Sequence, residues 1–490
     1  MAPGHPRHPG RQIPCAGGTH DSSRSVADRA PRRYSLHVSP HLDFLPLGGT
    51  GEIGMNLNLY GFGDRWLMVD AGVMFERSPG GGNKVLYPDP SFIAARRRKL
   101  VGLVLTHVHQ DHLGAVADLW PQLRCTVYAT PFGAAMLEGP LREAKLLDQV
   151  PVRVVEETAS FGVGPFQLRR IPLTHSTVEM GALHIDTPAG RVLHTGDFKI
   201  DPDPVVGRTC DEATLKRLQG VDLCVSDSTN ADHEGWTPSE ASLASGLREQ
   251  LVGAAGRVAV PMFSTNVARI ETLARLALET DRDLLFVGRS VERTVMAARK
   301  AGYLQELPAV VPMGHFGYLP AERVLMVCTG SQGEPEAALS RMATGEHRWA
   351  YLEPGDKVVF SARAIPGNEL ALERLHLLLR RSGVEVVTAE DAPVHASGHP
   401  RRDELRQLYD WARPKVVVPV HGTPPKLEAH AELAESMGME AVRLRNGQRL
   451  RLEDGELSIV ETVRTGRLQR QERRRGGSRP SRKGRRWGRR

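Results

Sequence analysis

The sequence predicts an α/β fold with more than one domain. Short apolar runs that read as buried strands alternate with stretches of helical character along most of the chain. A length of 490 residues can bury a large core and exceeds the usual size of one domain. Several apolar runs end on His, Asp, Gly or Ser, at the position from which α/β folds present functional groups.

The first predicted elements form a hairpin and a tight turn. Residues 44–47 read as a strand, and residues 48–54 form a glycine-rich turn. Residues 57–60 and 66–69 read as a pair of strands that ends on Asp70. The turn lacks the spacing and the Gly-Lys-Ser/Thr ending of a P-loop, so a tight turn beside a functional site is favoured over a nucleotide site.

The alternation of strands and helices continues toward the C-terminus. Helices are predicted over residues 238–251 and 267–279, and strands separated by helices of this length indicate parallel βαβ units. The remaining strands are expected at residues 103–105, 192–194, 223–225, 258–261, 284–287, 324–328, 357–360, 384–388 and 416–420.

The segment from His107 to His112 is the most informative part of the chain. It reads His-Val-His-Gln-Asp-His directly after an apolar run. Imidazole and carboxylate groups suit a borderline cation such as Zn²⁺. Because His107 and His109 alternate with Val108, their side chains can leave one face of an extended segment together. Asp111 and His112 follow the strand, where a turn can direct them toward a second ion.

A dinuclear centre needs ligands from other strand ends, because one loop cannot satisfy two ions. His175, Asp197 and His421 each follow an apolar strand directly. Each of them alone reads more readily as a capping or surface residue. Together with the segment 107–112, they predict that one site collects ligands from several strands.

In this order, the motifs resemble those of the metallo-β-lactamase superfamily. The resemblance rests on His-Val-His-Gln-Asp-His at 107–112, Thr-His-Ser at 174–176, Thr-Gly-Asp at 195–197 and Val-His-Gly at 420–422. Asp70 matches an early aspartate that usually supports the metal loop. The middle of the chain is similar to the β-CASP insertion of ribonuclease J, through motifs at 226–230, 263–266, 288–290, 329–335 and 395–399.

The resemblance, which runs from about Phe44 to Gly466, implies a four-layer αβ/βα metallo-β-lactamase fold with an inserted α/β β-CASP domain. Residues 42–226 and 386–465 would form the two parts of the metallo-β-lactamase domain, and residues 227–385 the β-CASP domain. Residues 1–41 would be a disordered basic extension, and residues 466–490 an Arg-rich disordered tail.

The resemblance also implies a zinc-dependent ribonuclease that hydrolyses RNA phosphodiesters, by 5′-3′ exonuclease and endonuclease activity, in RNA processing and decay. Two Zn²⁺ per chain are expected, with Mn²⁺ as the alternative metal. One ion would be held by His107, His109, His175 and Asp197, and the other by Asp111, His112, Asp197 and His421.

Asp227 and His399 match the β-CASP motifs that act in proton transfer. His399 would protonate the leaving 3′ oxygen or stabilise the charged phosphorane, and Asp227 would orient it or relay protons. In the plainer interpretation, His399 caps the helix that follows it.

A pocket for the 5′-monophosphate of RNA is expected beside His399. The Ala-Ser-Gly turn before His399 leaves backbone N–H groups free to cradle a phosphate. Arg289 could fork onto phosphate oxygens, or could equally form a structural ion pair. The residues assigned to the pocket are Ser264, Thr265, Asn266, Arg289, Ser290, His395, Ala396, Ser397, Gly398 and His399.

Three other functions stay open at this stage. They are a small-molecule metallo-hydrolase, a DNA-processing β-CASP nuclease and a non-enzymatic RNA-binding scaffold, and the Ser-Gly-His and Thr-Gly-Ser-Gln-Gly-Glu-Pro signatures favour the RNA branch. Ribonuclease J relatives commonly continue into a C-terminal domain that aids dimerisation. Here a short Arg-rich tail follows Gly466, so a homodimer is left undecided. The family often has Glu after the last His-Gly, where this chain has Thr423.

The charge of the chain is unevenly distributed. The net charge is +7, but residues 464–490 carry 13 Lys and Arg against one acid, and residues 1–35 carry six Arg against two Asp. The remainder therefore has a net charge of −9. Basic ends are attracted to polyanions, although a merely solubilising tail is nearly as good an interpretation. Trp487 slightly favours nucleic-acid contact.

A cytoplasmic protein without membrane contact is expected. The mean hydropathy is −0.31, and no run approaches the roughly 20 apolar residues that span a bilayer. The first 35 residues contain no apolar segment typical of a secretory signal. Reduced thiols are favoured because no C-x-x-C pair occurs among Cys15, Cys125, Cys210, Cys224 and Cys328.

Overall fold

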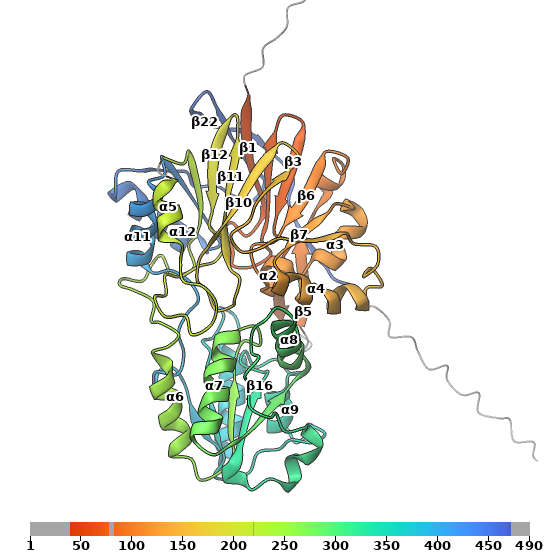
Figure 1. Cartoon of the computed structure of the whole chain (residues 1–490), viewed down its shortest axis with the longest axis vertical. Coiled ribbons are helices and arrows are strands. Elements are labelled where there is room, and N and C mark those ends of the chain that lie inside the picture. The colour runs from red at the N-terminus through yellow and green to blue at the C-terminus, as the bar shows by residue number, and fades with distance from the viewer. Residues whose placement is uncertain (1–39, 78–82, 219, 472–490) are drawn as a thin grey trace, which may run out of the picture. The chain divides into compact units, whose positions relative to one another are not determined.

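Two β-sheets face each other in the part of the chain that carries the predicted metal ligands (Figure 1). The computed structural model describes residues 40–77, 83–218 and 220–471. The first sheet has the strand order β22-β21-β1-β2-β3-β6-β7-β8, and the second has the order β20-β19-β13-β12-β11-β10-β9.

The strands of the first sheet are β1 (His41–Gly48), β2 (Leu57–Phe62), β3 (Arg65–Val69), β6 (Leu100–Val104), β7 (Val127–Ala129), β8 (Val152–Val154), β21 (Gln448–Glu453) and β22 (Glu456–Thr462). Those of the second are β9 (Ser160–Val163), β10 (Phe166–Pro172), β11 (Gly181–Thr187), β12 (Gly190–His194), β13 (Leu223–Asp227), β19 (Val416–Val420) and β20 (Glu440–Ala441).

The core between these sheets is built from alternate residues of their strands. Tyr60, Val69 and Val104 of the first sheet are buried in one apolar cluster with Val225 and Val418 of the second. Because successive side chains of a strand point to opposite faces, the other residues of the same strands pack outward against helices. The result is four layers in the order helix, sheet, sheet and helix.

The helices of this part lie on the two outer faces. Against the second sheet, an apolar cluster unites Leu193 and Val417 with residues of α5 (Glu212–Arg217), α11 (Arg402–Ala412) and α12 (Pro424–Ser436). Against the first sheet, an apolar cluster unites Leu59 and Met68 with residues of α1 (Ser91–Ala94), α2 (Gln110–Leu113), α3 (Val116–Leu123) and α4 (Pro131–Glu143). The predicted metallo-β-lactamase fold is therefore confirmed.

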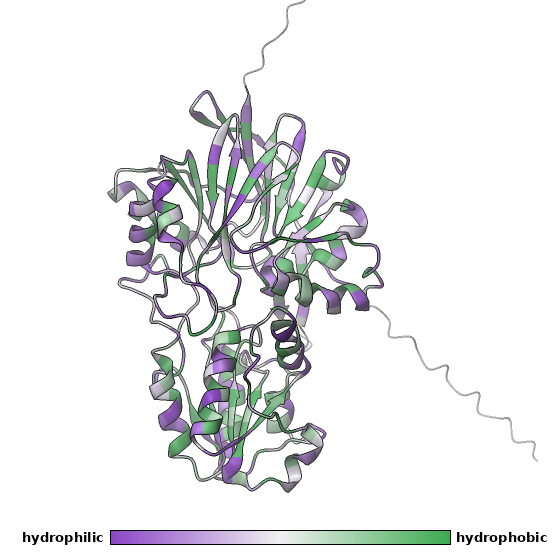
Figure 2. Ribbon diagram, viewed as in Figure 1, coloured by the Kyte–Doolittle hydropathy of each residue, from purple (hydrophilic) through white to green (hydrophobic). Residues whose placement is uncertain are grey.

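A third sheet is formed by the segment between β13 and β19. All of its strand pairs are parallel, and their order is β15-β16-β14-β17-β18. In Figure 2 its strands are mostly apolar, as expected for a sheet covered by helices. The strands are β14 (Val258–Pro261), β15 (Asp283–Val287), β16 (Val324–Cys328), β17 (Lys357–Val359) and β18 (Glu385–Val387).

The helices of this inserted part are α6 (Leu243–Val252), α7 (Val267–Glu279), α8 (Arg289–Lys300), α9 (Ala338–Ala343) and α10 (Glu369–Arg381), with short 3₁₀ turns η1 (Met313–Tyr318) and η2 (Ala321–Arg323). The helix expected from residue 238 begins only at Leu243. Ser239 and Glu240 precede it and form hydrogen bonds with Asp203 and Asp201 instead of α-helical ones. Glu240 accepts a hydrogen bond from the buried guanidinium of Arg269 at 3.0 Å.

The start of the Arg-rich tail was predicted too early. Residues 467–469 form β23 (Arg467–Gln469), which pairs with β5 (Asn83–Pro88), and β5 pairs with β4 (Met74–Arg77). Arg470 then forms an ion pair with Asp118 at 2.6 Å. These contacts stabilise a segment whose composition alone reads as unstructured. Most of the two predicted basic ends, namely residues 1–39 and 472–490, lies outside the described residues.

Smaller differences concern other predicted limits. β1 begins at His41, one residue inside the predicted extension, and the segment expected at 227–385 starts on the last residue of β13 and stops within β18. Across the described ranges, no helix is long and apolar enough to cross a membrane. Four cysteines in those ranges, Cys125, Cys210, Cys224 and Cys328, carry free thiols.

Candidate metal centre

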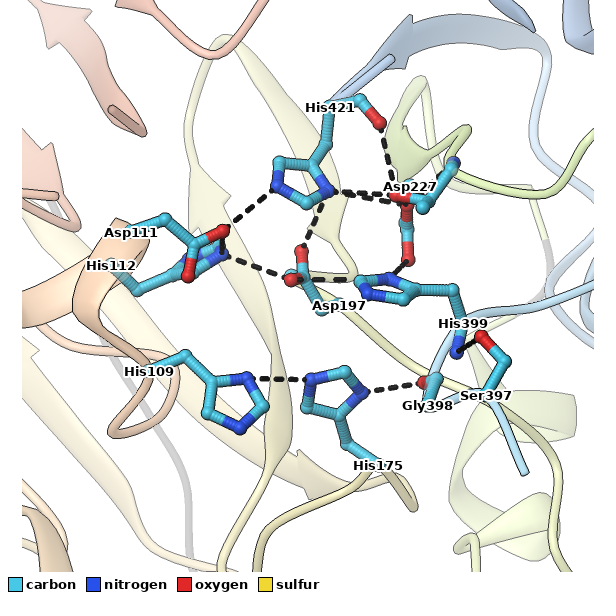
Figure 3. A network of polar contacts seen from close by, with 12 residues as sticks. His109, Asp111, His112, His175, Asp197, Asp227, Ser397, Gly398, His399 and His421 are labelled. Atoms are coloured by element: carbon cyan, nitrogen blue, oxygen red, sulfur yellow. Dashed lines mark hydrogen bonds and ion pairs between the residues drawn. The ribbon is translucent and has the colours of Figure 1, made fainter. Parts of the chain in front are cut away.

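The ends of several strands bring His and Asp side chains into one cluster (Figure 3). Strands β12, β13 and β19 are parallel neighbours, so the residues that follow them meet at one sheet edge. The loop after β6 and the short helix α2 approach this edge from the facing sheet. Three overlapping groups result, namely His107/His109/His175/Asp197, Asp111/His112/Asp197/His421 and Asp197/Asp227/His399/His421, each with ligand atoms within 4.8 Å of one another.

The first group is rich in imidazole. His175 Nε2 lies 2.9 Å from His109 Nδ1, and His107 Nε2 lies 3.9 Å from Asp197 Oδ2. Burial lowers the pKa of His109 to about 4 and holds the pKa values of His107 and His175 well below their usual range. These three rings are therefore neutral at pH 7, which is the form that coordinates a metal ion.

Unsatisfied polar atoms in this group fit a cation. In the described residues, His107 Nε2, His109 Nε2 and Asp197 Oδ1 are buried and have no hydrogen-bond partner. A buried polar atom without a partner is costly, and such atoms are rare in folded proteins. Ring nitrogens and a carboxylate oxygen that face one another are the ligand set that zinc prefers.

The second group contains more negative charge. His112 Nε2 lies 3.1 Å from Asp197 Oδ2, and His421 Nε2 lies 3.1 Å from Asp111 Oδ2. Burial alone would lower the pKa values of both rings, but the Asp197 carboxylate and its neighbours raise that of His421 to about 10 and also raise that of His112. Burial would raise the pKa of Asp197, yet the two imidazoles lower it to about 2. A metal cation and the ring protons would compete for the same nitrogens.

Asp70 supports the metal loop from behind, as the family pattern predicted. Its Oδ1 accepts a hydrogen bond from Thr106 N at 2.8 Å, and its Oδ2 lies 2.7 Å from His112 Nδ1. With the Nδ1 proton directed at Asp70, the Nε2 lone pair of His112 faces Asp197. Asp70 is fully buried and has φ +64°, a backbone conformation that few residues other than glycine adopt.

His175 is held in an equivalent way by the loop that carries His399. Its Nδ1 donates to the carbonyl oxygen of Gly398, which leaves Nε2 facing the first group. A Cβ at residue 398 would lie 2.7 Å from two atoms of the His175 ring, so only glycine allows this approach. Gly398, which follows the inserted segment, therefore orients His175, a predicted ligand that precedes it.

Asp227 and His399 form a pair beside Asp197. His399 Nδ1 lies 2.8 Å from Asp227 Oδ2, while Thr229 donates to Asp227 Oδ1 through its backbone N at 2.8 Å and its hydroxyl at 2.6 Å. Burial alone would lower the pKa of His399, but Asp227 raises it. The plainer interpretation of His399 as a helix cap is not supported, since its ring contacts Asp227 and the capping residue of α11 is Arg401.

The glycine-rich turn of residues 48–54 lies beside this cluster, as the sequence indicated. His421 N donates to Gly49 O at 2.6 Å, and Asn56 Nδ2 lies 3.0 Å from His112 Nε2. At Gly72, a Cβ would stand 1.6 Å from the carbonyl oxygen of Asp111. Sequence reasoning missed Asn56 and Gly72, although both adjoin motifs that it singled out.

The residues expected to bind phosphate gather only in part. Ser264, Thr265 and Asn266 follow β14 and Arg289 and Ser290 follow β15, at one edge of the third sheet. His395 lies near this edge, because Ser361 N donates to Pro261 O and Ser361 Oγ donates to Val394 O. Of the expected residues, His395 has a buried Nδ1 without a partner within the described ranges.

Other members of this set have structural partners. Asn266 caps α7 by accepting from Arg269 N at 2.9 Å, and Ser397 Oγ accepts from Asn230 Nδ2 at 3.0 Å. Arg289 is exposed and forms no ion pair in the part of the chain that the structure describes. The structural ion pair considered for it is therefore not formed there.

Comparisons with known proteins agree with this architecture. Residues 65–262 match the Beta-lactamase superfamily domain, residues 255–377 the family described as Ribonuclease J, beta-CASP domain, and residues 384–444 the Zn-dependent metallo-hydrolase RNA specificity domain. A crystal structure of a protein of unknown function from Enterococcus faecalis V583 has the same fold, with a TM-score of 0.59 and 15% identity over 84% of this chain and 100% of that one.

The fold and its His/Asp clusters define a metallo-hydrolase of the metallo-β-lactamase superfamily with a β-CASP insertion. Ribonuclease J from Sinorhizobium meliloti is 42% identical over 90% of this chain and 79% of its own length. Ribonuclease J from Mycolicibacterium smegmatis is 39% identical over 86% of this chain and 76% of its own length. The chain belongs to the ribonuclease J family, and it is a metal-dependent ribonuclease that acts on RNA.

Proposed function

We propose that this enzyme hydrolyses RNA from a 5′-monophosphorylated end in the 5′-3′ direction, also cleaves internally, and works with two Zn²⁺ per chain in the cytoplasm. The observation that carries the proposal is the joint position of the ligand groups and the Asp227–His399 pair around one carboxylate. His112 Nε2 and His399 Nδ1 lie 3.1 and 3.9 Å from the same atom, Asp197 Oδ2.

The residues that would hold the ions are the seven expected from the sequence. The set His107, His109, His175 and Asp197 would hold one ion, and the set Asp111, His112, Asp197 and His421 the other. When bound, such ions lower the pKa of a water and stabilise negative charge on the phosphate. Asp197 belongs to both sets, so its two oxygens allow it to bridge them. Mn²⁺ would fit the same nitrogen and oxygen donors.

The chain's own acid–base group would be His399. Asp227 accepts from His399 Nδ1, and this bond fixes the orientation of the ring while leaving Nε2 for the substrate. His399 would then donate a proton from Nε2 to the 3′ oxygen that leaves the phosphorus. Thr229 holds Asp227 through two hydrogen bonds, so the carboxylate is kept in the position that directs the ring.

A 5′-monophosphate would bind next to His399, at the turn of residues 395–398. Among the described residues, His395 Nδ1 is buried and has no hydrogen-bond partner, and the guanidinium of Arg289 at the start of α8 forms no ion pair. Ser264 and Thr265 precede α7, and the positive end of the dipole of that helix would favour a phosphate there. Asn266 would act as the cap of that helix. We propose that residues 227–385 work as one domain that supplies this pocket, while homodimer formation is left to measurement of the molar mass in solution.

A comparison of substrates tests the proposal. Cleavage of one RNA sequence with a 5′-monophosphate or a 5′-triphosphate, and of the matching DNA, is measured with and without a chelator. We expect the 5′-monophosphorylated RNA to be degraded fastest, the DNA to be resistant, and activity to return when Zn²⁺ is added back to chelated enzyme. Equal rates on both RNA ends would overturn the phosphate pocket, and equal cleavage of DNA would overturn the assigned substrate.

A further inference from the structure

A row of basic residues crosses the first sheet at the edge opposite the metal ligands. Strands β3, β6 and β7 are parallel neighbours, so they all begin at one edge. Trp66 pairs with Leu100, a register that sets Arg65 and Lys99 side by side on strands about 4.8 Å apart. Arg124 ends α3 as its C-cap residue, three residues before β7, which pairs with β6.

Two further arginines extend this row. Arg97 and Arg98 directly precede Lys99 in the turn that leads into β6, and all three side chains are exposed. Within the described residues, none of these three forms an ion pair through its side chain. We name the five residues Arg65, Arg97, Arg98, Lys99 and Arg124 the basic edge.

Only part of this charge is neutralised nearby. Asp64 pairs with Arg65 at 3.2 Å, and Arg124 packs over the ring of Trp120 with its Cζ 5.7 Å from the ring centroid. The neighbouring Arg96 is not counted, because it donates to Phe92 O and stacks on the Phe92 ring. Residues 36–463 have a net charge of −9, so the basic edge is a local concentration of positive charge in a part of the chain that is acidic as a whole.

Backbone hydrogen bonds hold residues 97–99 of the basic edge, and Arg65 Nη1 adds a contact to Arg98 O at 3.5 Å. Lys99 O accepts from Trp66 N at 2.9 Å, and Lys99 N donates to Arg96 O at 2.7 Å. Lys99 directly precedes β6 and His107 follows it, so the five residues of that strand separate them by about 16 Å at 3.3 Å per residue. The basic edge is thus a separate surface, and its side chains can be removed with little effect on the fold.

We propose that the basic edge binds the phosphate backbone of an RNA segment other than the one in the active site. This inference rests on RNA being the substrate of the proposed function. Arginine and lysine side chains that lack local partners attract phosphates through charge and release counterions on binding. When an RNA is bound at one surface, its effective concentration at the other surface rises. An RNA long enough to reach both surfaces is therefore bound more tightly than a short one.

The test compares two triple variants of the full chain with equal charge loss. The first is R97A/R98A/K99A, and the matched control is R374A/R380A/R381A on α10, where three exposed arginines also lack ion pairs in the described ranges. Binding of uncleavable 2′-O-methyl RNA of about 40 and about 6 nucleotides is measured against salt concentration. Cleavage of a short 5′-monophosphorylated RNA is measured in parallel.

For R97A/R98A/K99A we expect Kd for the long RNA to rise on the order of 10-fold, with unchanged Kd and cleavage rate for the short RNA. The slope of log K against log salt should fall by about 2, since each lost phosphate contact removes about 0.7. Unchanged binding of long RNA, or equal weakening by the control variant, would overturn the proposal. Failure of the unaltered protein to cleave the short RNA would instead contradict the proposed function.

Discussion

Gly398 lies against the imidazole ring of His175, and a Cβ at that position would stand 2.7 Å from both Nδ1 and Cε1 of the ring. The carbonyl oxygen of Gly398 also accepts the Nδ1 proton of His175. The loop that carries His399 and a residue of the first ligand group are therefore fitted to one another at the level of single atoms.

Replacing Gly398 with Ala should displace His175 and weaken the first ligand group. We expect metal affinity and cleavage to fall about 10- to 100-fold, the range for groups that orient a metal ligand. Metal titration and initial cleavage rates measure the effect. Gly139→Ala is the control, because a Cβ there meets no atom within 4 Å. Wild-type metal affinity in Gly398→Ala would show that the close contact is unimportant.

Asp70→Asn should change which nitrogen of His112 carries the proton. Asp70 Oδ2 accepts from His112 Nδ1, and Asp70 Oδ1 accepts from Thr106 N. An Asn side chain whose oxygen keeps the bond to Thr106 N would direct its NH₂ group, a donor, at His112 Nδ1. The proton would then move to Nε2, the atom that faces Asp197. Loss of about 10- to 100-fold in affinity for one of two metal ions is expected. The number of metal ions bound per chain and their affinities are measured, and Asp186→Asn, at an exposed position, is the control.

His399→Ala should abolish cleavage while metal content stays intact. General acid–base groups contribute about 10²- to 10⁴-fold to the rate, and the loss should fall on kcat under single-turnover conditions. Asp227→Asn should lower the rate as well, because His399 loses the partner that orients its ring. His315→Ala, an exposed histidine in the inserted part, serves as the control. Cleavage by His399→Ala at the wild-type rate would refute its assigned role.

Because of Asp201, the free energy of unfolding should depend on pH in the acidic range. Its Oδ2 lies 2.8 Å from the buried Nζ of Lys199, and although burial would raise the pKa of Asp201, Lys199 lowers it. A lowered pKa in the folded state gives stability that is present above the unfolded value of about 4 and is lost as pH falls through the folded value.

Asp201→Asn should therefore lower the free energy of unfolding at pH 7 by on the order of 3 kcal/mol, since Lys199 would be left buried without its partner. Urea unfolding at a series of pH values measures the difference between variant and wild type. This difference should shrink as the pH is lowered below about 4. A difference that is constant over that range would exclude the ion pair as its source.

The strand ends that carry the predicted ligands can be recognised from the sequence because their signals are local. His175, Asp197 and His421 directly follow apolar runs, so hydrophobic pattern and residue type together mark them. The structure brings these residues into one cluster with the segment 107–112. Their occupation by zinc stays a prediction.

Contacts between distant segments could not be read in this way. Asn56 reaches His112 across 56 positions, and Thr229 reaches His421 across 192, without any motif that links them. The polar and basic composition of β23 predicts a tail, whereas pairing with β5 and the ion pair of Arg470 order this segment. Such elements depend on tertiary partners and not on local propensity.

The order of the ligands along the chain has a consequence for synthesis of the protein. His421 lies 3.1 Å from Asp111, although 310 positions separate them, and the whole inserted part is translated between Asp197 and His421. A nascent chain on the ribosome thus lacks a complete centre until almost all of its described residues have emerged. The residue that completes the second of the predicted ligand groups is thus among the last described residues to be synthesised.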